Sequence, residues 1–136
     1  MCRTLSAFIA LALLLSLSCS RPDPPHLGEW ESNDNSLGST WFNTLCFFDN
    51  GSVRRLSGVD PLKSNMVEGR YMIDYSRSPI EIDISVKDKE TLQGIIRFVG
   101  EDRNRMQMLF DPEGKKRPVA FEPDLRLVTW TKKAKK

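Results

Sequence analysis

The chain is poor in the residues that most often carry catalysis or bind metal ions. It has a single histidine, His26, and three cysteines, Cys2, Cys19 and Cys46. A zinc site needs several His or Cys ligands, and a nucleophilic Ser or Cys needs a histidine held rigidly beside it. His26 lies in a proline-rich stretch, where we expect a solvated linker side chain. The sequence therefore predicts no enzyme, no metal site and no cofactor.

Helical patterning and long apolar runs are also scarce. After Cys19 no stretch shows the apolar period of an amphipathic helix, and we expect at most one short helix, over residues 35–43. The longest apolar run, Leu5 to Leu17, would rise only about 20 Å as a helix. Because a hydrocarbon core is about 30 Å thick, a permanent membrane span is not expected.

The chain has no large excess of charge of either sign, since its formal net charge is +2. Four lysines lie in the last five residues, and the rest of the mature chain is slightly acidic. A slightly acidic body predicts no binding to nucleic acid. We expect residues 132–136 to form a frayed, solvated basic tail, with contact to anionic lipid head groups as the alternative.

The N-terminus combines a positive start, an apolar run and a cysteine. Arg3 precedes the apolar run, and Ser18 stands directly before Cys19. This pattern resembles a bacterial lipoprotein signal peptide. The resemblance implies that residues 1–18 are removed and that Cys19 carries several acyl chains, such as palmitate, as a stable membrane anchor. Ordinary secretory cleavage, with Cys19 an incidental thiol, is the alternative. Ser20 favours the outer membrane of the cell envelope, with the protein facing the periplasm.

Two features follow directly after this leader. Residues 19–26 include three prolines, Pro22, Pro24 and Pro25, which favour an extended, semi-rigid tether. With Cys19 lipidated, only Cys46 is left, so no internal disulfide is expected. Cys46 lies in an apolar run, where we expect a buried, unreactive side chain. One domain, over residues 27–131, would follow the tether.

The domain has the pattern of β-structure. In Ile80 to Val86, apolar and polar residues alternate over seven positions, which predicts a strand with one buried and one wet face. Glu81 and Asp83 would lie on the wet face and keep it soluble. Turn signals separate further candidate strands. The full set of expected strands is 28–31, 44–48, 53–56, 67–75, 80–86, 91–99, 105–110, 118–121 and 125–131.

Short strands at this spacing predict an all-β fold, an antiparallel meander of about eight strands closed into a small barrel. Closure removes the exposed sheet edges, and a barrel of this size is either filled by side chains or holds one small ligand. Alternation predicts the interior residues, which are Trp30, Leu45, Phe47, Tyr71, Ile73, Ile82, Ile84, Ile96, Phe98, Met108 and Phe110.

An ordered set of short motifs carries a family resemblance. Trp30 opens the domain, Gly69-Arg70-Tyr71 leads to Pro79-Ile80-Glu81-Ile82-Asp83, and Gly94-Ile95-Ile96 and Arg117-Pro118-Val119-Ala120-Phe121 follow. This order resembles small bacterial lipocalin-like lipoprotein domains. The resemblance covers most of residues 27–131 and implies a lipocalin-like barrel, but it supplies no catalytic residues. Arg97, Phe98 and the Met106-Gln107-Met108 segment depart from the pattern.

Two classes of function remain open. The first is a carrier that holds a small apolar ligand in the barrel, lined or gated by Trp30, Trp41, Tyr71, Phe98 and Met108. Plain core packing is the alternative role for these side chains. The second is a periplasmic protein-interaction module, such as an inhibitor of a cell-wall hydrolase or an accessory of an envelope complex. Such a module would use an exposed loop or strand edge, for example residues 32–40.

Overall fold

The protein folds into a closed antiparallel β-barrel. A computed structural model describes residues 21–34, 41–111, 113–122 and 127–134. The eight strands are β1 (Gly28–Asp34), β2 (Trp41–Phe47), β3 (Ser52–Gly58), β4 (Asn65–Asp74), β5 (Ile80–Val86), β6 (Leu92–Val99), β7 (Arg105–Phe110) and β8 (Val128–Lys132), with one 3-10 turn, η1 (Pro61–Lys63), between β3 and β4.

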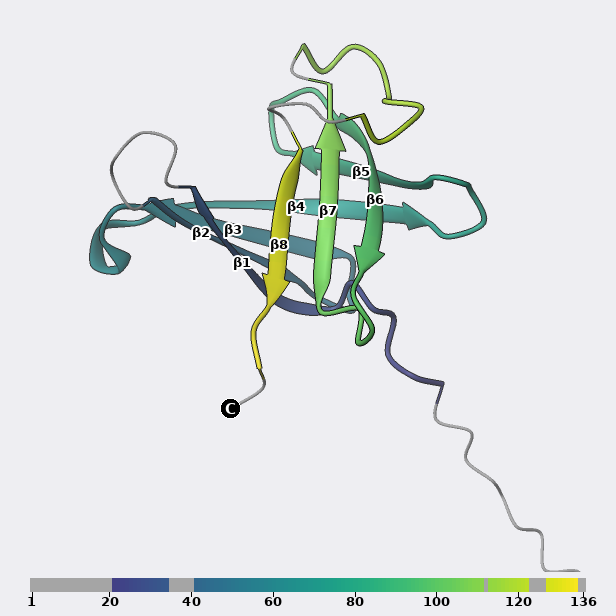
Figure 1. Cartoon of the computed structure of the whole chain (residues 1–136). Coiled ribbons are helices and arrows are strands. Elements are labelled where there is room, and N and C mark those ends of the chain that lie inside the picture. Colours follow the sequence, from purple (N-terminus) through teal and green to yellow (C-terminus); the bar gives the residue numbers. More distant parts are fainter. Residues whose placement is uncertain (1–20, 35–40, 112, 123–126, 135–136) are drawn as a thin grey trace, which may run out of the picture.

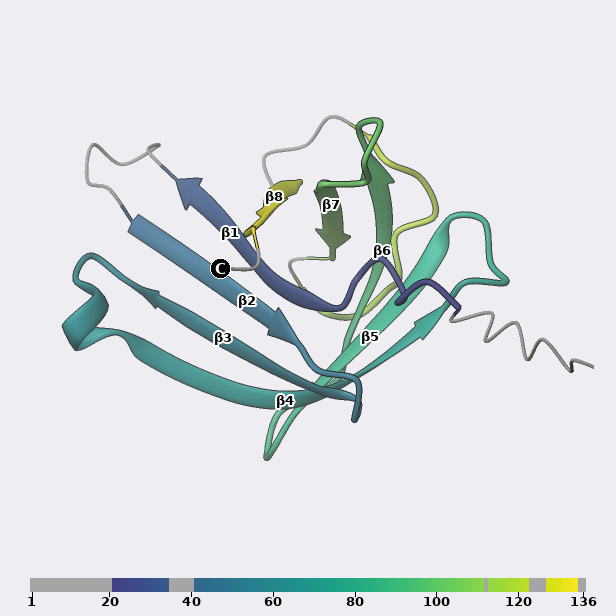
Figure 2. The same cartoon turned by 90° about the horizontal axis from the view of Figure 1, so that it is seen from below.

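Each strand pairs with the next one along the chain, and β8 returns to pair with β1. The closing seam joins Trp30 to Lys132 and Glu31 to Thr131. Figure 1 shows β6, β7 and β8 crossing over β1 to β4, and Figure 2 shows the strands surrounding a common interior. The predicted all-β, eight-stranded antiparallel barrel is therefore confirmed.

Local sequence determines most strand bounds. The structure reproduces two of the predicted strands, 80–86 and 105–110, residue for residue. Turn chemistry separates neighbouring strands as expected: Asn50 Oδ1 accepts a hydrogen bond from the Ser52 backbone N–H at 2.9 Å, and Gly51 has a positive φ of 78°. Asp74 Oδ1 accepts in the same way from Ser76 between β4 and β5.

Two local predictions were wrong. Residues 118–121 form no strand, because this segment crosses the outside of the barrel and pairs with none of its strands. Residues 41–43 of the short helix expected over 35–43 belong to β2, where Trp41 pairs with Asp34 of β1. The rest of that expected helix, residues 35–40, lies outside the described part of the chain.

All eleven predicted interior residues belong to the barrel core or pack against it. Those at the centre, such as Trp30, Ile82 and Ile96, are fully buried. Alternation along the strands thus identified the interior face correctly. The core also includes Val53, Met106 and Trp130, with Leu27 and Ile80 packed against it.

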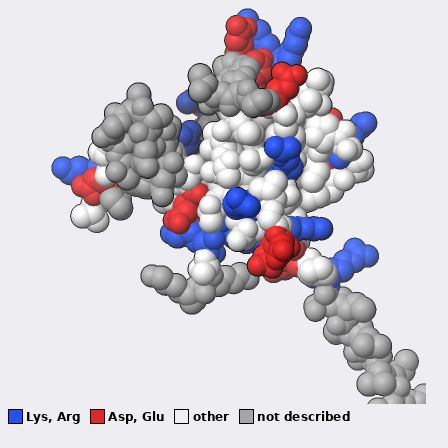
Figure 3. Space-filling model, viewed as in Figure 1, with Lys and Arg blue, Asp and Glu red and all other residues white. Residues whose placement is uncertain are grey.

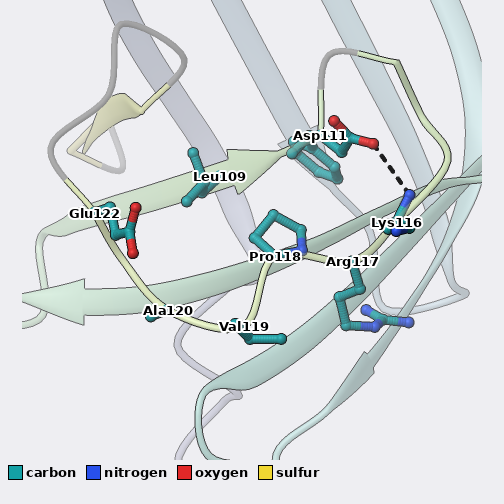
Figure 4. Close-up of a pocket in the computed structure, with 9 residues that line it drawn as sticks. Leu109, Asp111, Lys116, Arg117, Pro118, Val119, Ala120 and Glu122 are labelled. Atoms are coloured by element: carbon teal, nitrogen blue, oxygen red, sulfur yellow. Dashed lines mark hydrogen bonds between the residues drawn. The ribbon is translucent and has the colours of Figure 1, made fainter.

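The segment after β7 covers part of the outer surface. Ile95 and Leu109 alternate with interior residues and so face outward, yet both are buried. Figure 4 shows Pro118, Val119 and Ala120 crossing beside Leu109, with a small cleft of about 280 Å³ between this segment and β7. The barrel therefore has a second, smaller apolar contact on its outside.

Arg117 fastens this segment to β5 and β6. Its guanidinium donates to the backbone oxygens of Ile82 and Gly94, at 3.2 and 2.8 Å, and to Asp83 Oδ1 at 2.7 Å. Glu81 lies 3.5 Å from the same guanidinium. The two acidic residues expected on a wet strand face are therefore ion-paired and only partly exposed.

Gly94 provides a test of interior packing. The ring of Phe110, the pairing partner of Gly94 on β7, would lie 2.5 Å from a Cβ at position 94. We expect Gly94→Ala to lower the free energy of unfolding by about 1–3 kcal/mol, because the added methyl overpacks the core. Urea denaturation measures the change. Gly58→Ala is the control, since its nearest neighbour would be at an ordinary 3.4 Å; equal losses in the two variants would contradict the prediction.

Candidate functional site in the barrel interior

One end of the barrel is partly covered by residues that the sequence assigned to the tether. His26 is buried, with only 6% of its surface exposed, so the expectation of a solvated linker side chain was wrong. Its carbonyl oxygen accepts a hydrogen bond of 2.8 Å from Trp30 Nε1, and Leu27 N donates to the Pro24 oxygen. The folded part therefore begins before Leu27, because these backbone groups bind the first strand.

The ring of His26 is held by two tyrosines at this end. Nδ1 lies 2.6 Å from the Tyr75 hydroxyl, and Nε2 lies 2.9 Å from the Tyr71 hydroxyl. Tyr71 donates its own proton to the Phe48 oxygen at 2.7 Å, so it accepts from His26 Nε2–H. This assignment leaves Nδ1 to accept from Tyr75. Both ring nitrogens are thus satisfied in the neutral imidazole.

Burial sets the protonation of this cluster. Desolvation, and secondarily the Lys132 ammonium, lower the pKa of His26 from 6.5 to about 4. Burial also raises the pKa of Tyr75 to about 12. The cluster is therefore neutral near pH 7, with its protons fixed by hydrogen bonds.

Lys132 belongs to this end of the barrel and not to the predicted solvated tail. It is the last residue of β8, and its ammonium donates to the Pro25 oxygen at 3.0 Å and lies 5.2 Å from the centre of the Trp30 ring. The next residue, Lys133, donates its backbone N–H to the Glu29 oxygen and pairs with the Glu29 carboxylate. The tail predicted over 132–136 is thus ordered at its start, because its lysines extend the contact between β8 and β1.

The described side chains do not fill the other half of the barrel interior. It contains a cavity of about 450 Å³, on the side of the β3–β4 and β5–β6 connections. Its described lining is Ser32, Asn43, Leu45, Val53, Arg55, Val67, Gly69, Ile84, Val86, Lys89, Leu92, Met108, Phe110, Val128 and Trp130. Most of these side chains are aliphatic or aromatic, so the cavity offers an apolar surface with a few polar groups.

The predicted ligand-contacting residues divide between the two halves. Met108 lines the cavity and is buried. Trp30, Tyr71 and Phe98 lie in the packed half, where Tyr71 contacts His26 and the Phe98 ring lies 6.1 Å from that of Trp30. The side chain of Trp41 and the whole of Cys19 lie outside the described residues.

Sequence reasoning missed several residues of the cavity wall. Arg55 and Val128 were not singled out, although each follows the alternation of its strand: Arg55 is two residues from Val53, and Val128 is two from Trp130. Extending the alternation along β3 and β8 would have found both. Lys89, in a turn, has no such signal.

Cys46 is half-buried and not fully buried as expected. Burial, and secondarily the Glu29 carboxylate, raise the pKa of its thiol. The raised pKa keeps the thiol protonated near neutral pH, where a thiol is a weak nucleophile.

Comparisons with known proteins give no relative, since no family model, curated protein or solved structure matches this chain. In the described residues, no helix has the length and apolar character to cross a membrane. On the face shown in Figure 3, acidic and basic side chains are interspersed over the barrel surface.

The buried histidine makes stability depend on pH. Because the pKa of His26 is about 4 in the folded state and near 6.5 in the unfolded state, the unfolded chain binds more protons between these values. We therefore expect the free energy of unfolding to fall by about 2–3 kcal/mol as the pH decreases from 7 to 4. The measurement is urea denaturation at a series of pH values. His26→Gln should lose this part of the dependence, and an identical pH profile for both proteins would refute the assignment.

Proposed function

We propose that the protein is a membrane-anchored lipoprotein whose lipocalin-like barrel binds a small apolar ligand in its interior. The observation that carries the proposal is the cavity of about 450 Å³ inside the barrel. Its size falls in the range of small-molecule sites, roughly 300–1,000 Å³. A core filled throughout by side chains would have supported plain packing instead.

The chemistry of the wall supports an apolar ligand. Val53, Ile84 and Met108 belong both to this wall and to the core or its margin, so a ligand would continue the hydrophobic core. Each Å² of apolar ligand surface that leaves water contributes about 25 cal/mol. The packed half below the cavity is a preformed floor, which lowers the ordering cost of binding.

The anchor is supported by sequence alone. Residues 1–18 and Cys19 have the pattern of a lipoprotein leader, and such a leader would place the barrel outside the cytosol on the envelope membrane. Binding to that membrane through acyl chains on Cys19 is therefore part of the proposal. No catalytic step is included in it.

One observation favours the alternative, a protein-interaction module. Around η1 three apolar side chains, Val59, Leu62 and Met66, are exposed, Leu62 to 93%. Exposed apolar residues that lie together are typical of a surface that meets a partner. Native mass spectrometry of protein purified from its own host distinguishes the two: a bound small molecule supports the carrier, and a bound protein supports the module.

Filling the cavity tests ligand binding directly. The fluorescence of the neutral probe N-phenyl-1-naphthylamine rises when the probe enters an apolar site, and we expect the protein to bind it. Val67 lines the cavity and is 40% exposed, so Val67→Trp should occupy the space and lower affinity roughly tenfold or more. Met72→Trp is the matched control on the same strand, because Met72 is 71% exposed and faces outward. Equal binding by the two variants would exclude the cavity as the site.

Lipidation of Cys19 is tested by metabolic labelling. Cells that express the full chain should incorporate radiolabelled palmitate, and the labelled protein should sediment with membranes. Cys19→Ala should abolish both, whereas Cys46→Ala should leave both unchanged because Cys46 lies on a barrel strand. Unlabelled wild-type protein that keeps its leader would disprove the anchor.

A further inference from the structure

We propose that the ligand is a single-chain amphiphile with an anionic head group, and that Arg55 and Lys89 bind this head group while the apolar wall takes the chain. The inference rests on the proposed function and specifies its substrate class. Three observations on the cavity wall support it.

The first observation is the sign of the charges. Among the described residues that line the cavity, the charged ones are Arg55 and Lys89, both cationic. Neither forms an ion pair within the described part of the chain, whereas the neighbouring Arg54, on the outer face, lies 2.8 Å from Glu68. Arg55 and Lys89 are both exposed, so they lie at the mouth of the apolar chamber. Two cations without carboxylate partners at that mouth are complementary to a ligand that supplies the anion.

The second observation is the arrangement of the polar groups. Ser32, Asn43 and Arg55 lie on the adjacent strands β1, β2 and β3, and Ser32 pairs with Asn43 in register. Asn43 Oδ1 accepts a hydrogen bond of 2.8 Å from the Arg55 guanidinium. This bond orients the guanidinium and leaves the Asn43 amide to donate. Three polar residues of the described lining are therefore gathered on one side, whereas Lys89 belongs to the connection between β5 and β6.

The third observation is a buried donor without a partner. Trp130, on β8 next to β1, is 7% exposed, and its Nε1–H has no hydrogen-bond partner among the described residues. An unsatisfied buried donor is unfavourable, because it has lost its hydrogen bond to water and gained none in the protein. Because Trp130 lines the cavity beside the donors of β1 to β3, an oxygen of the ligand near this wall would satisfy it.

These donors and cations also define what the cavity excludes. A cationic head group would be repelled by Arg55 and Lys89 and could accept no hydrogen bond. A neutral alcohol would gain the apolar burial but only a weak polar contact. Affinity should therefore follow the order anion, alcohol, cation for head groups on the same alkyl chain.

Competition for the cavity tests this order. Decanoate, decanol and decyltrimethylammonium have the same alkyl length, and each is titrated against bound N-phenyl-1-naphthylamine below its micellar concentration. We expect decanoate to displace the probe at a concentration roughly tenfold lower than decyltrimethylammonium, with decanol between them. Equal displacement by the anion and the cation would overturn the inference.

Neutralising the two cations locates the effect. Arg55→Gln and Lys89→Gln should each weaken decanoate binding by about three- to tenfold and leave decanol unchanged. Arg54→Gln and Lys87→Gln are the matched controls, since these residues do not belong to the described lining. An equal loss for decanoate and decanol in Arg55→Gln would show a structural role and contradict the head-group assignment.

Failure of the inference and failure of the proposed function give different results. If the probe binds but the three head groups compete equally, the cavity takes an apolar ligand without selecting an anion. If the probe does not bind and Val67→Trp changes nothing, the carrier function itself is wrong. Selective competition by decanoate that is lost in Arg55→Gln supports both.

Discussion

The pairing of β1 with β8 is the contact on which the rest of the barrel depends. Without it the meander would have two unpaired edges, and its interior would open to water. Among the described residues the seam is short, since it pairs Trp30 with Lys132 and Glu31 with Thr131. Contacts beyond the strands reinforce it: Lys132 donates to the Pro25 oxygen, and Lys133 binds the backbone and the carboxylate of Glu29. Residues outside the predicted domain thus contribute to the closure.

The size of the side chains explains why the interior is packed at one end and hollow at the other. Trp30, Phe47, Tyr71 and Phe98 fill the end near His26 with aromatic rings. At the other end the described wall includes Trp130 and Phe110 but also four valines and Gly69, so many of its side chains are small. A barrel of eight strands can be filled completely, so the cavity results from this uneven distribution.

Local pattern was enough to predict the fold and the interior face. Alternation along β5 and turn residues such as Asn50 and Gly51 act over a few positions, and the structure follows them closely. The closure of the sheet into a barrel could be predicted because exposed sheet edges are unfavourable and closure removes them.

The candidate site was only partly predictable, because it depends on contacts between residues far apart in the chain. Three prolines around His26 indicated a solvated tether, yet Tyr71 and Tyr75, more than forty residues away, bury its ring. Of the aromatics chosen as ligand contacts, Trp30, Tyr71 and Phe98 fill the floor, and smaller residues such as Val53 border the cavity. Packing across the barrel decides which interior residues border the cavity. The alternation of apolar and polar residues along a strand carries no information about that packing.

For the proposed ligand carrier, the direction in which the chain enters the barrel has a consequence for ligand exchange. Residues 21–26 reach β1 at the end that contains His26, and the cavity lies toward the opposite end, where η1 joins β3 to β4. If the barrel is anchored at residue 19 and binds a ligand, as proposed, its floor would face the bilayer and its ligand-binding end would face the aqueous compartment. The ligand would then be exchanged with soluble proteins or with a facing membrane. Direct extraction of a ligand from the anchoring leaflet would require the barrel to turn over on its short proline-rich tether.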